Sequence, residues 1–319
     1  MNHIIVTMTE SKDIPGWGWK LALASAAAIW GGSFVVIKGA LDAMPAAWLM
    51  ALRFALAAVV LIIVFRRRLV ENFDGSHLVA GMLLGVVEGT GFVVQNMGLE
   101  STTPGRNAFL TAVYCVLVPF VNWAMAGRRP GANNVLAAVL CMAGVGFLSL
   151  GDDLSFSLGI GDKLTLVSAV LYAVHIVLVS KLASAHDVMT LTIVQIATSA
   201  LVALCFALAL EPAPDVSVFT PDFLAALAYL VILASCVAMV VQNFGQSKVP
   251  PAQAALLLSM ESLFAVLASV VFCQEQVTDR MLGGFALIFL AVLASEVGGL
   301  IVRHARDGAS AVPRPEEER

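Results

Sequence analysis

The chain has 319 residues, of which 60% are hydrophobic and 13% are charged, and its formal net charge is −4. A soluble domain needs about 25% charged residues to cover its surface, so this composition excludes a soluble globular protein. We therefore expect a multi-pass membrane protein. Its apolar segments have helical periodicity or are uniformly apolar, which indicates an all-α protein and excludes an outer-membrane β-barrel.

Ten apolar segments follow one another along the chain, and most reach the roughly 20 residues that a helix needs to cross the hydrocarbon core. The predicted transmembrane helices are 18–39, 45–65, 77–98, 104–126, 132–150, 160–183, 188–210, 220–245, 251–273 and 278–301. Outside them we expect a cytoplasmic N-terminal segment (1–17), an outer linker (151–159) and a disordered cytoplasmic tail (302–319). The N-terminal residues lack the basic-then-apolar order of a cleavable signal peptide, so the first helix should be retained.

The basic residues set the orientation of these helices, because short loops rich in Lys and Arg stay in the cytoplasm. With the N-terminus inside, thirteen Lys and Arg residues fall on the inner side and four at outer helix ends. The longest outer loop, 211–222, has three acidic residues and no basic one. We expect both termini in the cytoplasm, and the protein in the cytoplasmic (inner) membrane of a prokaryote.

A polar signature occurs twice, 147 residues apart, as Val-Val-Gln-Asn followed after one residue by glycine, at 93–98 and 240–245. Extending this alignment without gaps gives 8 identities in the 19 positions from Phe92 to Leu110. The chain therefore contains two homologous halves, 18–150 and 160–301, with five spans each. Because five is odd, the second half enters the membrane from the opposite side, which makes the two halves an inverted-topology repeat.

The third predicted helix carries glycines on one face and a carboxylate on another. Gly81, Gly85 and Gly89 recur at every fourth position, and such a stripe of small residues lets another helix backbone approach closely. We expect the stripe to pack against a neighbouring helix of the same chain. That contact would turn the opposite, polar face of the helix toward a cavity.

Ionisable residues inside the membrane cost about 2.5–3.5 kcal/mol each and so need a function or a partner. Glu88 and Glu261 lie near the middle of the third and ninth predicted helices. At the 147-residue spacing Glu261 corresponds to Tyr114, which places a carboxylate and a phenol at equivalent positions beside a pseudo-twofold axis. Arg53 is the only base deep in an apolar segment, and we expect a structural ion pair or a clamp on backbone carbonyls.

Other residues can provide the surface of a binding site or its gates. Aromatic rings offer cation–π surfaces, and a histidine can titrate near neutral pH, although packing explains the same residues. The predicted substrate-binding residues are Trp30, Glu88, Tyr114, Tyr172, His175 and Glu261. The amides Gln95, Asn96, Gln242 and Asn243 either gate a polar cavity or hydrogen-bond interrupted helix ends, and both interpretations stay open.

The sequence contains none of the common enzyme motifs, neither a zinc-protease HExxH, nor a GxSxG nucleophile elbow, nor a nucleotide-binding P-loop. Its five cysteines form no CxxC pair, and His, Cys and Asp do not cluster with metal-ligand spacing. We therefore expect no enzyme activity, no cofactor and no bound metal. The expected partners are a small-molecule substrate, protons and the lipid bilayer, without nucleic acid, and homodimer formation is left open.

Several of these residues together resemble the drug/metabolite transporter superfamily, in its EamA-like branch. The resemblance covers about 18–301, and the residues that carry it are Trp30-Gly31-Gly32-Ser33-Phe34, Arg53, Phe109-Leu110-Thr111, Pro119, Gly161-Asp162, Glu261 and Phe272-x-x-Glu275-x-x-Thr278. The chain departs from the pattern at Ser262, where the family usually has proline, and at Gln274, where it usually has glycine.

This resemblance implies ten helices in a 5+5 inverted repeat, with spans one, three, four, six, eight and nine around a central cavity that opens alternately to each side. It also implies a small cargo, commonly an amino acid, a related metabolite or a drug, which is usually exported. The residues themselves favour a zwitterionic or cationic substrate, a proton, or both in exchange. The alternatives are a facilitator for neutral or aromatic solutes and, from another class, a non-transporting membrane enzyme or sensor.

Overall fold

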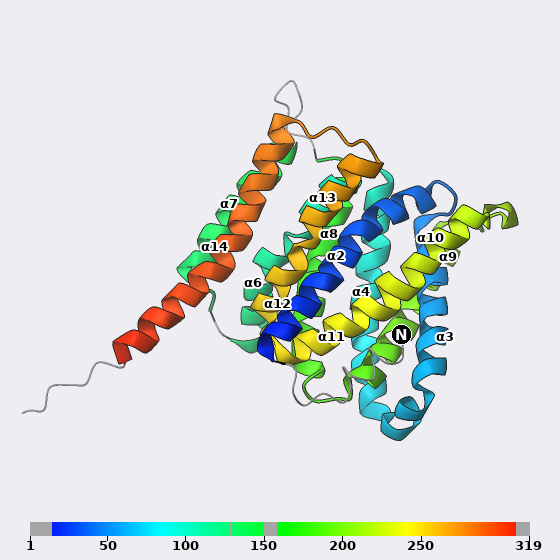
Figure 1. Cartoon of the computed structure of the whole chain (residues 1–319), viewed down its shortest axis with the longest axis horizontal. Coiled ribbons are helices and arrows are strands. Elements are labelled where there is room, and N and C mark those ends of the chain that lie inside the picture. Colours follow the sequence, from blue (N-terminus) through cyan, green and yellow to red (C-terminus); the bar gives the residue numbers. More distant parts are fainter. Residues whose placement is uncertain (1–14, 128, 150–157, 311–319) are drawn as a thin grey trace, which may run out of the picture.

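The structure is a computed structural model, and it describes residues 15–127, 129–149 and 158–310. Within these ranges every regular element is helical, and the helices form an elongated bundle (Figure 1). Most of the predicted N-terminal segment (1–17) and of the outer linker (151–159) lies outside the described residues.

The helices of the first half match the first five predicted spans to within a few residues. The exception is the second helix, which ends at Asn72 and not at the predicted residue 65. They are α2 (Gly16–Leu41), α3 (Ala46–Asn72), α4 (Gly75–Glu100), α5 (Pro104–Thr111), α6 (Tyr114–Ala126) and α7 (Ala132–Ser149). α5 and α6 together form the fourth span. Asp74 and Thr103 cap the first turns of α4 and α5 with side-chain oxygens, which explains where these helices begin.

The second half repeats this order. Its helices are α8 (Ile160–Leu182), α9 (Val188–Leu210), α10 (Pro221–Tyr229), η2 (Leu230–Val237), α11 (Ala238–Lys248), α12 (Pro251–Ser259), α13 (Glu261–Phe272) and α14 (Asp279–Ser310). α10, η2 and α11 are consecutive parts of one span, and α12 and α13 form the next. A single 3₁₀ turn, η1 (Val216–Val218), lies in the loop before α10.

Among the described residues, eight segments are long and apolar enough to cross a membrane, and Ala132–Val145 is a shorter apolar helix. With α14 they make up the ten predicted spans. The sequence predicted that 302–319 is a disordered tail. In the structure α14 continues to Ser310, so residues 302–310 are helical. Extending an existing helix costs little, and the first proline after it is Pro313. Residues 311–319 of the predicted tail lie outside the described residues.

Both repeats interrupt their fourth helix at the same place. In the first repeat the chain turns just before Tyr114, where α6 begins, and in the second it turns at Met260, just before Glu261 begins α13. The two first residues are 147 positions apart, which is the repeat spacing. The interruptions therefore place two helix ends at equivalent positions within the membrane.

The eighth span is irregular, because η2 winds as a π-helix. The equivalent residues of the first repeat, 83–90, belong to the regular α-helix α4. A π-helical turn changes the backbone hydrogen-bond pattern and often lies at a functional site. In η2 the carbonyl of Ala234 accepts hydrogen bonds from two side chains, Trp30 Nε1 at 2.8 Å and Arg53 Nη2 at 3.3 Å.

The glycine stripe of α4 packs against α9, as the sequence predicted. Gly85 lies against the backbone carbonyl of Gln195 and the side chain of Thr198, while Gly89 lies against Ser199. The hydroxyl of Ser199 donates a hydrogen bond to the carbonyl of Gly85 at 3.1 Å. The close contact leaves Glu88 on the part of α4 that borders a cavity.

The contacts between helices follow a pseudo-twofold relation between the repeats. The equivalent helices α3 and α9 pack on each other, and so do α7 and α14, which stand together at one side of the bundle (Figure 1). The remaining contacts come in exchanged pairs: α4 packs on α8 as α11 packs on α2, and α4 packs on α9 as η2 packs on α3. The two halves are therefore intertwined around one common interior.

Candidate functional site

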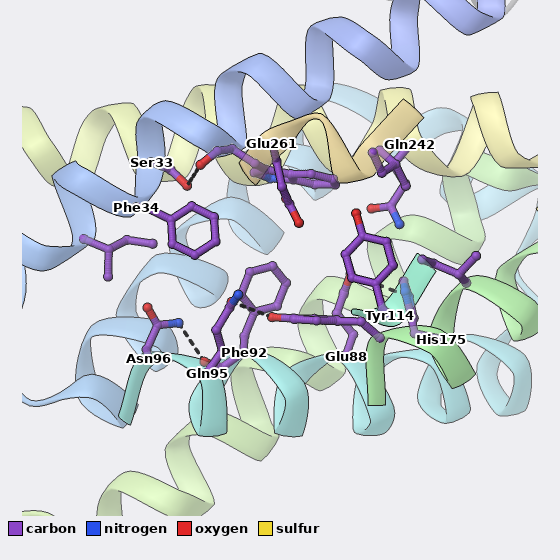
Figure 2. Close-up of a pocket in the computed structure, with 15 residues that line it drawn as sticks. Ser33, Phe34, Glu88, Phe92, Gln95, Asn96, Tyr114, His175, Gln242 and Glu261 are labelled. Carbon is purple, nitrogen blue, oxygen red and sulfur yellow. Dashed lines mark hydrogen bonds and ion pairs between the residues drawn. The ribbon is translucent and has the colours of Figure 1, made fainter. Parts of the chain in front are cut away.

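A cavity lies between the two repeats (Figure 2). The space between its walls, including its open mouth, is about 590 Å³. Its walls come from α2, α4, α6, α8, α11, α12 and α13, which are the six spans that the sequence resemblance implied. The lining residues are Trp30, Ser33, Phe34, Ile37, Glu88, Phe92, Gln95, Asn96, Tyr114, Tyr172, His175, Ile176, Gln242, Leu258 and Glu261.

The structure brings together at this cavity all six residues that the sequence predicted to bind substrate, namely Trp30, Glu88, Tyr114, Tyr172, His175 and Glu261. Three of the predicted gating residues, Gln95, Asn96 and Gln242, also line it. Asn243 and Arg53 are fully buried and do not reach it. The geometry places these residues, and their roles in binding or gating remain predictions.

Glu261 and Tyr114 point toward each other across part of the cavity (Figure 2). Each is the first residue after a helix interruption, so the pseudo-twofold relation brings the two breaks together at this point. The Glu261 carboxylate interacts with the Tyr114 hydroxyl, and the two residues are 7% and 3% exposed. A carboxylate with one phenolic partner at a cavity wall can meet a cation or take up a proton.

Aromatic rings form much of the remaining wall. Tyr172 packs edge-to-face against Phe92, with ring centroids 5.4 Å apart, and against Tyr114 at 6.5 Å. Trp30 is held by its hydrogen bond to the Ala234 carbonyl. Phe34 completes this side of the wall (Figure 2). Such rings bind apolar groups, and their faces attract organic cations.

Glu88 lies in a hydrogen-bonded cluster at the base of the cavity wall. Its Oε2 accepts a hydrogen bond from Gln195 Nε2 at 2.7 Å and one from Ser199 Oγ at 3.4 Å. His175 Nε2 lies 3.6 Å from Glu88 Oε1 and 3.1 Å from Gln195 Nε2. Asn243 Nδ2 donates to Gln195 Oε1 at 2.9 Å, which fixes the orientation of the glutamine amide.

Arg53 does not form the ion pair that the sequence suggested as one of its two roles. Among the described residues no carboxylate lies within ion-pair distance of its guanidinium. Instead Nε donates to Ser235 Oγ at 2.6 Å and Nη2 donates to the Ala234 carbonyl, while the rings of Phe54 and Phe92 each lie 5.2 Å from the guanidinium carbon. Arg53 therefore points from α3 toward η2. A carbonyl, a hydroxyl and two aromatic rings stabilise its charge there.

The amides of the repeated signature make hydrogen bonds inside the bundle. Gln95 donates to Thr111 Oγ1 at 2.8 Å and accepts from the Tyr172 hydroxyl at 2.8 Å, so it joins α4 to α5 and α8. Asn96 donates to the backbone carbonyl of Phe92 at 2.6 Å. In the second repeat Asn243 donates to Thr192 Oγ1 at 2.8 Å as well as to Gln195.

Sequence reasoning did not single out Gln195, Ser199 or Ser235 as members of the site. The repeat itself carried a signal for two of them. Aligning Pro45 with Asp187 pairs Arg53 with Gln195, and the 147-residue spacing pairs Glu88 with Ser235. Polar residues at matched depths in helices that pack together are candidates for mutual contact. The described residues contain no group of three or more His, Cys, Asp or Glu side chains able to hold a metal ion.

Two segments of the chain, 17–150 and 159–295, match the model of the EamA-like transporter family. The chain belongs to this family. Two curated relatives from Archaeoglobus fulgidus are both described as uncharacterized transporters. One is 29% identical over 86% of this chain and 84% of its own length, and the other is 31% identical over 77% and 86%. A crystal structure covering 90% of this chain and 97% of its own has a TM-score of 0.66 at 21% identity, which supports the fold.

This EamA-like transporter has a polar residue where a family glycine is common. Gln274, after α13, has φ = 52°, in the left-handed region that glycine adopts without steric cost. The backbone conformation at this position therefore explains why the family usually has glycine there. At Ser262, where proline is common, the chain still interrupts the helix two residues earlier, at Met260, and the serine hydroxyl donates to the carbonyl of Ser259 at 2.8 Å.

Proposed function

We propose that this EamA-like transporter is a secondary active transporter that exports a small amino-acid-like metabolite or drug, zwitterionic or cationic, by alternating access. The observation that carries the proposal is the pairing of Glu261 with Tyr114 at the two helix interruptions, inside a cavity between the repeats. Interrupted helices at the interface of two repeats are where secondary transporters bind their substrates.

Alternating access is supported by the relation between the repeats. Each repeat has five spans, and because five is odd, the second repeat has the opposite orientation in the membrane to the first. Exchanging the conformations of the two repeats would then move the cavity opening from one side to the other. We place both termini in the cytoplasm and the protein in the cytoplasmic membrane, on the basis of the thirteen-to-four bias of basic residues.

The substrate class follows from the groups around the cavity. Two carboxylates and five aromatic rings line it, while Arg53, the deeply placed base, points elsewhere. A cationic group beside Glu261 would gain both charge neutralisation and contact with aromatic faces. An amino-acid carboxylate of a zwitterion would find donors in the amides of Gln95 and Gln242.

A thermal-shift screen of the purified protein against amino acids, quaternary amines, nucleosides and common drugs tests this proposal. Compounds with a cationic group should raise the melting temperature, because a ligand that binds only the folded state stabilises it. Each hit is then tested for saturable flux in proteoliposomes. Stabilisation by anions alone, or hits that show no flux, would contradict the proposed substrate class.

The aromatic lining also favours a second candidate, a facilitator for neutral or aromatic solutes. In that case Glu88 and Glu261 are structural residues. Flux would follow the substrate gradient at every pH and would not respond to an imposed pH gradient. The proposed active transporter, when coupled to protons, accumulates its substrate against a gradient only while a pH difference exists.

A further inference from the structure

We propose that Glu88 and His175 form the proton-binding pair of this transporter, separate from Glu261, which meets the substrate. This inference rests on the proposed function, and it assigns proton binding to Glu88 and His175 and substrate binding to Glu261. Both sites line the same cavity, with Glu261 on one side of it and Glu88 and His175 on the other (Figure 2). Water entering from either side would therefore reach both.

The hydrogen bonds of Gln195 fit a cluster in which His175 is an acceptor. The Oε1 atom of Gln195 accepts from Asn243, so its Nε2 is the donor group of the amide. That Nε2 lies 2.7 Å from Glu88 Oε2 and 3.1 Å from His175 Nε2, and its two hydrogens serve both acceptors. This arrangement suits a neutral imidazole whose Nε2 accepts, because a protonated Nε2 would face the Gln195 amide as a second donor.

A proton has a defined place in this cluster. On His175 Nε2 it would face Glu88 Oε1, 3.6 Å away, and a small rotation of either side chain would make a charge-assisted hydrogen bond. On Glu88 Oε1 the same proton would point back at the imidazole nitrogen. In both cases the pair gains one positive charge, and loss of the proton restores the Gln195 hydrogen bond to His175.

The repeat explains why Glu88 is free to titrate. Gln195 is the equivalent of Arg53, and Ser235 is the equivalent of Glu88. The matched contacts are Gln195 with Glu88 at 2.7 Å and Arg53 with Ser235 at 2.6 Å. The chain thus places its arginine opposite the hydroxyl and a neutral amide opposite the carboxylate. An arginine at position 195 would hold Glu88 permanently ionised.

Other titratable groups face this pair from each surrounding helix. Arg53 on α3 attracts the Glu88 carboxylate through space without reaching it. The phenols of Tyr172 on α8 and Tyr114 on α6 lie on the cavity side, as does Glu261 on α13. Because Glu261 shares the cavity, a cationic substrate bound there would repel a proton on the pair, which couples the two binding events.

Infrared spectroscopy of the substrate-free protein tests the pair with the proton as the probe. Glu261→Gln removes one buried carboxyl, and in this background we expect a protonated-carboxyl band that titrates with pH. The double variant Glu261→Gln, Glu88→Gln should lack that band. Adding His175→Gln to the Glu261→Gln background should move its midpoint by about one pH unit or more, because the neighbouring base is gone. A band that survives Glu88→Gln, or a midpoint unmoved by His175→Gln, would refute the pair.

Proteoliposomes loaded with a radiolabelled mixture of the twenty amino acids give the second readout. Glu88→Gln should reduce accumulation driven by a pH gradient much more than it reduces exchange of label across the membrane. Wild-type accumulation in this variant, or equal loss of accumulation and exchange, would argue against a dedicated proton site. Thr90→Ala, on the same helix at a partly exposed position where the hydroxyl donates to the Val86 carbonyl, should change neither readout. If the wild type moves no amino acid, that substrate proposal fails, while the infrared result still decides the proton pair.

Discussion

Arg53 donates a 2.6 Å hydrogen bond to Ser235, and this contact is the repeat counterpart of the one between Gln195 and Glu88. The same two helix faces thus meet twice in the molecule, once with a cation and a hydroxyl and once with an amide and a carboxylate. The contact between Arg53 and Ser235 holds the π-helical segment η2 in place, because the guanidinium also donates to the carbonyl of Ala234.

Replacing Arg53 with lysine should therefore destabilise the protein although the charge is kept. A lysine has one compact ammonium group and cannot bind the hydroxyl and the carbonyl with the same planar geometry. Leaving a buried acceptor unpaired costs about 1–3 kcal/mol, so the melting temperature in detergent should fall. Arg66→Lys, at the exposed inner end of α3, is the matched control and should melt like the wild type. Equal melting of both variants would mean that η2 does not depend on Arg53.

Gly85→Ala should lower the folded yield and the melting temperature, because a methyl group there collides with the backbone carbonyl of Gln195. Overpacking of this kind typically costs about 1–3 kcal/mol. Gly39→Ala is the matched control, since a Cβ at Gly39 meets nothing within 4 Å and alanine favours a helix. If both variants melt alike, α4 and α9 are less tightly packed than the structure indicates.

The ion pair between Arg68 of α3 and Asp187, which precedes α9, should make stability depend on acid. Burial raises the pKa of Asp187, but hydrogen bonds from Arg68 and Thr190 outweigh it and hold the pKa below its ordinary value of 3.8. A lowered pKa contributes stability that is complete above the ordinary value and is lost as pH falls through the folded value. The difference in melting temperature between wild type and Asp187→Asn should be constant above about pH 5 and shrink below about pH 4.

A matched charge removal separates this effect from general acid sensitivity. Glu71→Gln lies at the exposed inner end of the same helix as Arg68. Its melting difference from the wild type should stay small at every pH, because an exposed charge without a close partner contributes little. An acid dependence as large as that of Asp187→Asn would assign the effect to net charge instead of the ion pair.

Gln274→Gly should raise the melting temperature. The residue has φ = 52°, where a side chain is strained and glycine is not. Relief of this kind is worth about 1 kcal/mol, reduced by the extra freedom that glycine gives the unfolded chain. Gln274→Ala keeps a Cβ and should bring no gain. If alanine stabilises as much as glycine, the benefit comes from removing the glutamine side chain and not from the backbone.

The sequence predicted those features that membrane thickness and the repeat determine. A spanning helix must cover a fixed length, so the ends of α4, α8 and α9 fall within two residues of their predicted positions. The repeat spacing placed Tyr114 and Glu261 at equivalent depths, and the structure adds that both begin a half-helix.

Contacts that depend on the rotation of a helix about its axis could not be read from the sequence. The sequence suggested an ion pair as one of two roles for Arg53, but α3 directs its side chain toward η2. The π-helical turns of η2 also lack a local signal, since the segment reads as an ordinary apolar helix. Glu88 finds Gln195, 107 residues away, only because α4 and α9 pack through the glycine stripe.

Glu261→Gln gives the most direct test of how the cavity works. The substitution keeps the size of the side chain and a polar group facing Tyr114, while it removes the charge that faces the cavity. We expect the variant to insert and fold with a melting temperature close to that of the wild type. Its affinity for cationic compounds identified by thermal shift should fall by about tenfold or more, equivalent to about 1.4 kcal/mol, since a charge pair in a partly desolvated site is lost.

Tyr114→Phe serves as the companion variant, because it removes the partner of the carboxylate and keeps the charge. Tyr114→Phe should still bind cations, but the pH dependence of binding should change. Glu261→Gln should abolish the part of that pH dependence which comes from the Glu261 carboxyl. Binding is measured by thermal shift and by calorimetry between pH 5 and pH 9. If Glu261→Gln binds and transports like the wild type across this range, Glu261 is a structural anchor of α13, and the charge that selects the substrate must be that of Glu88.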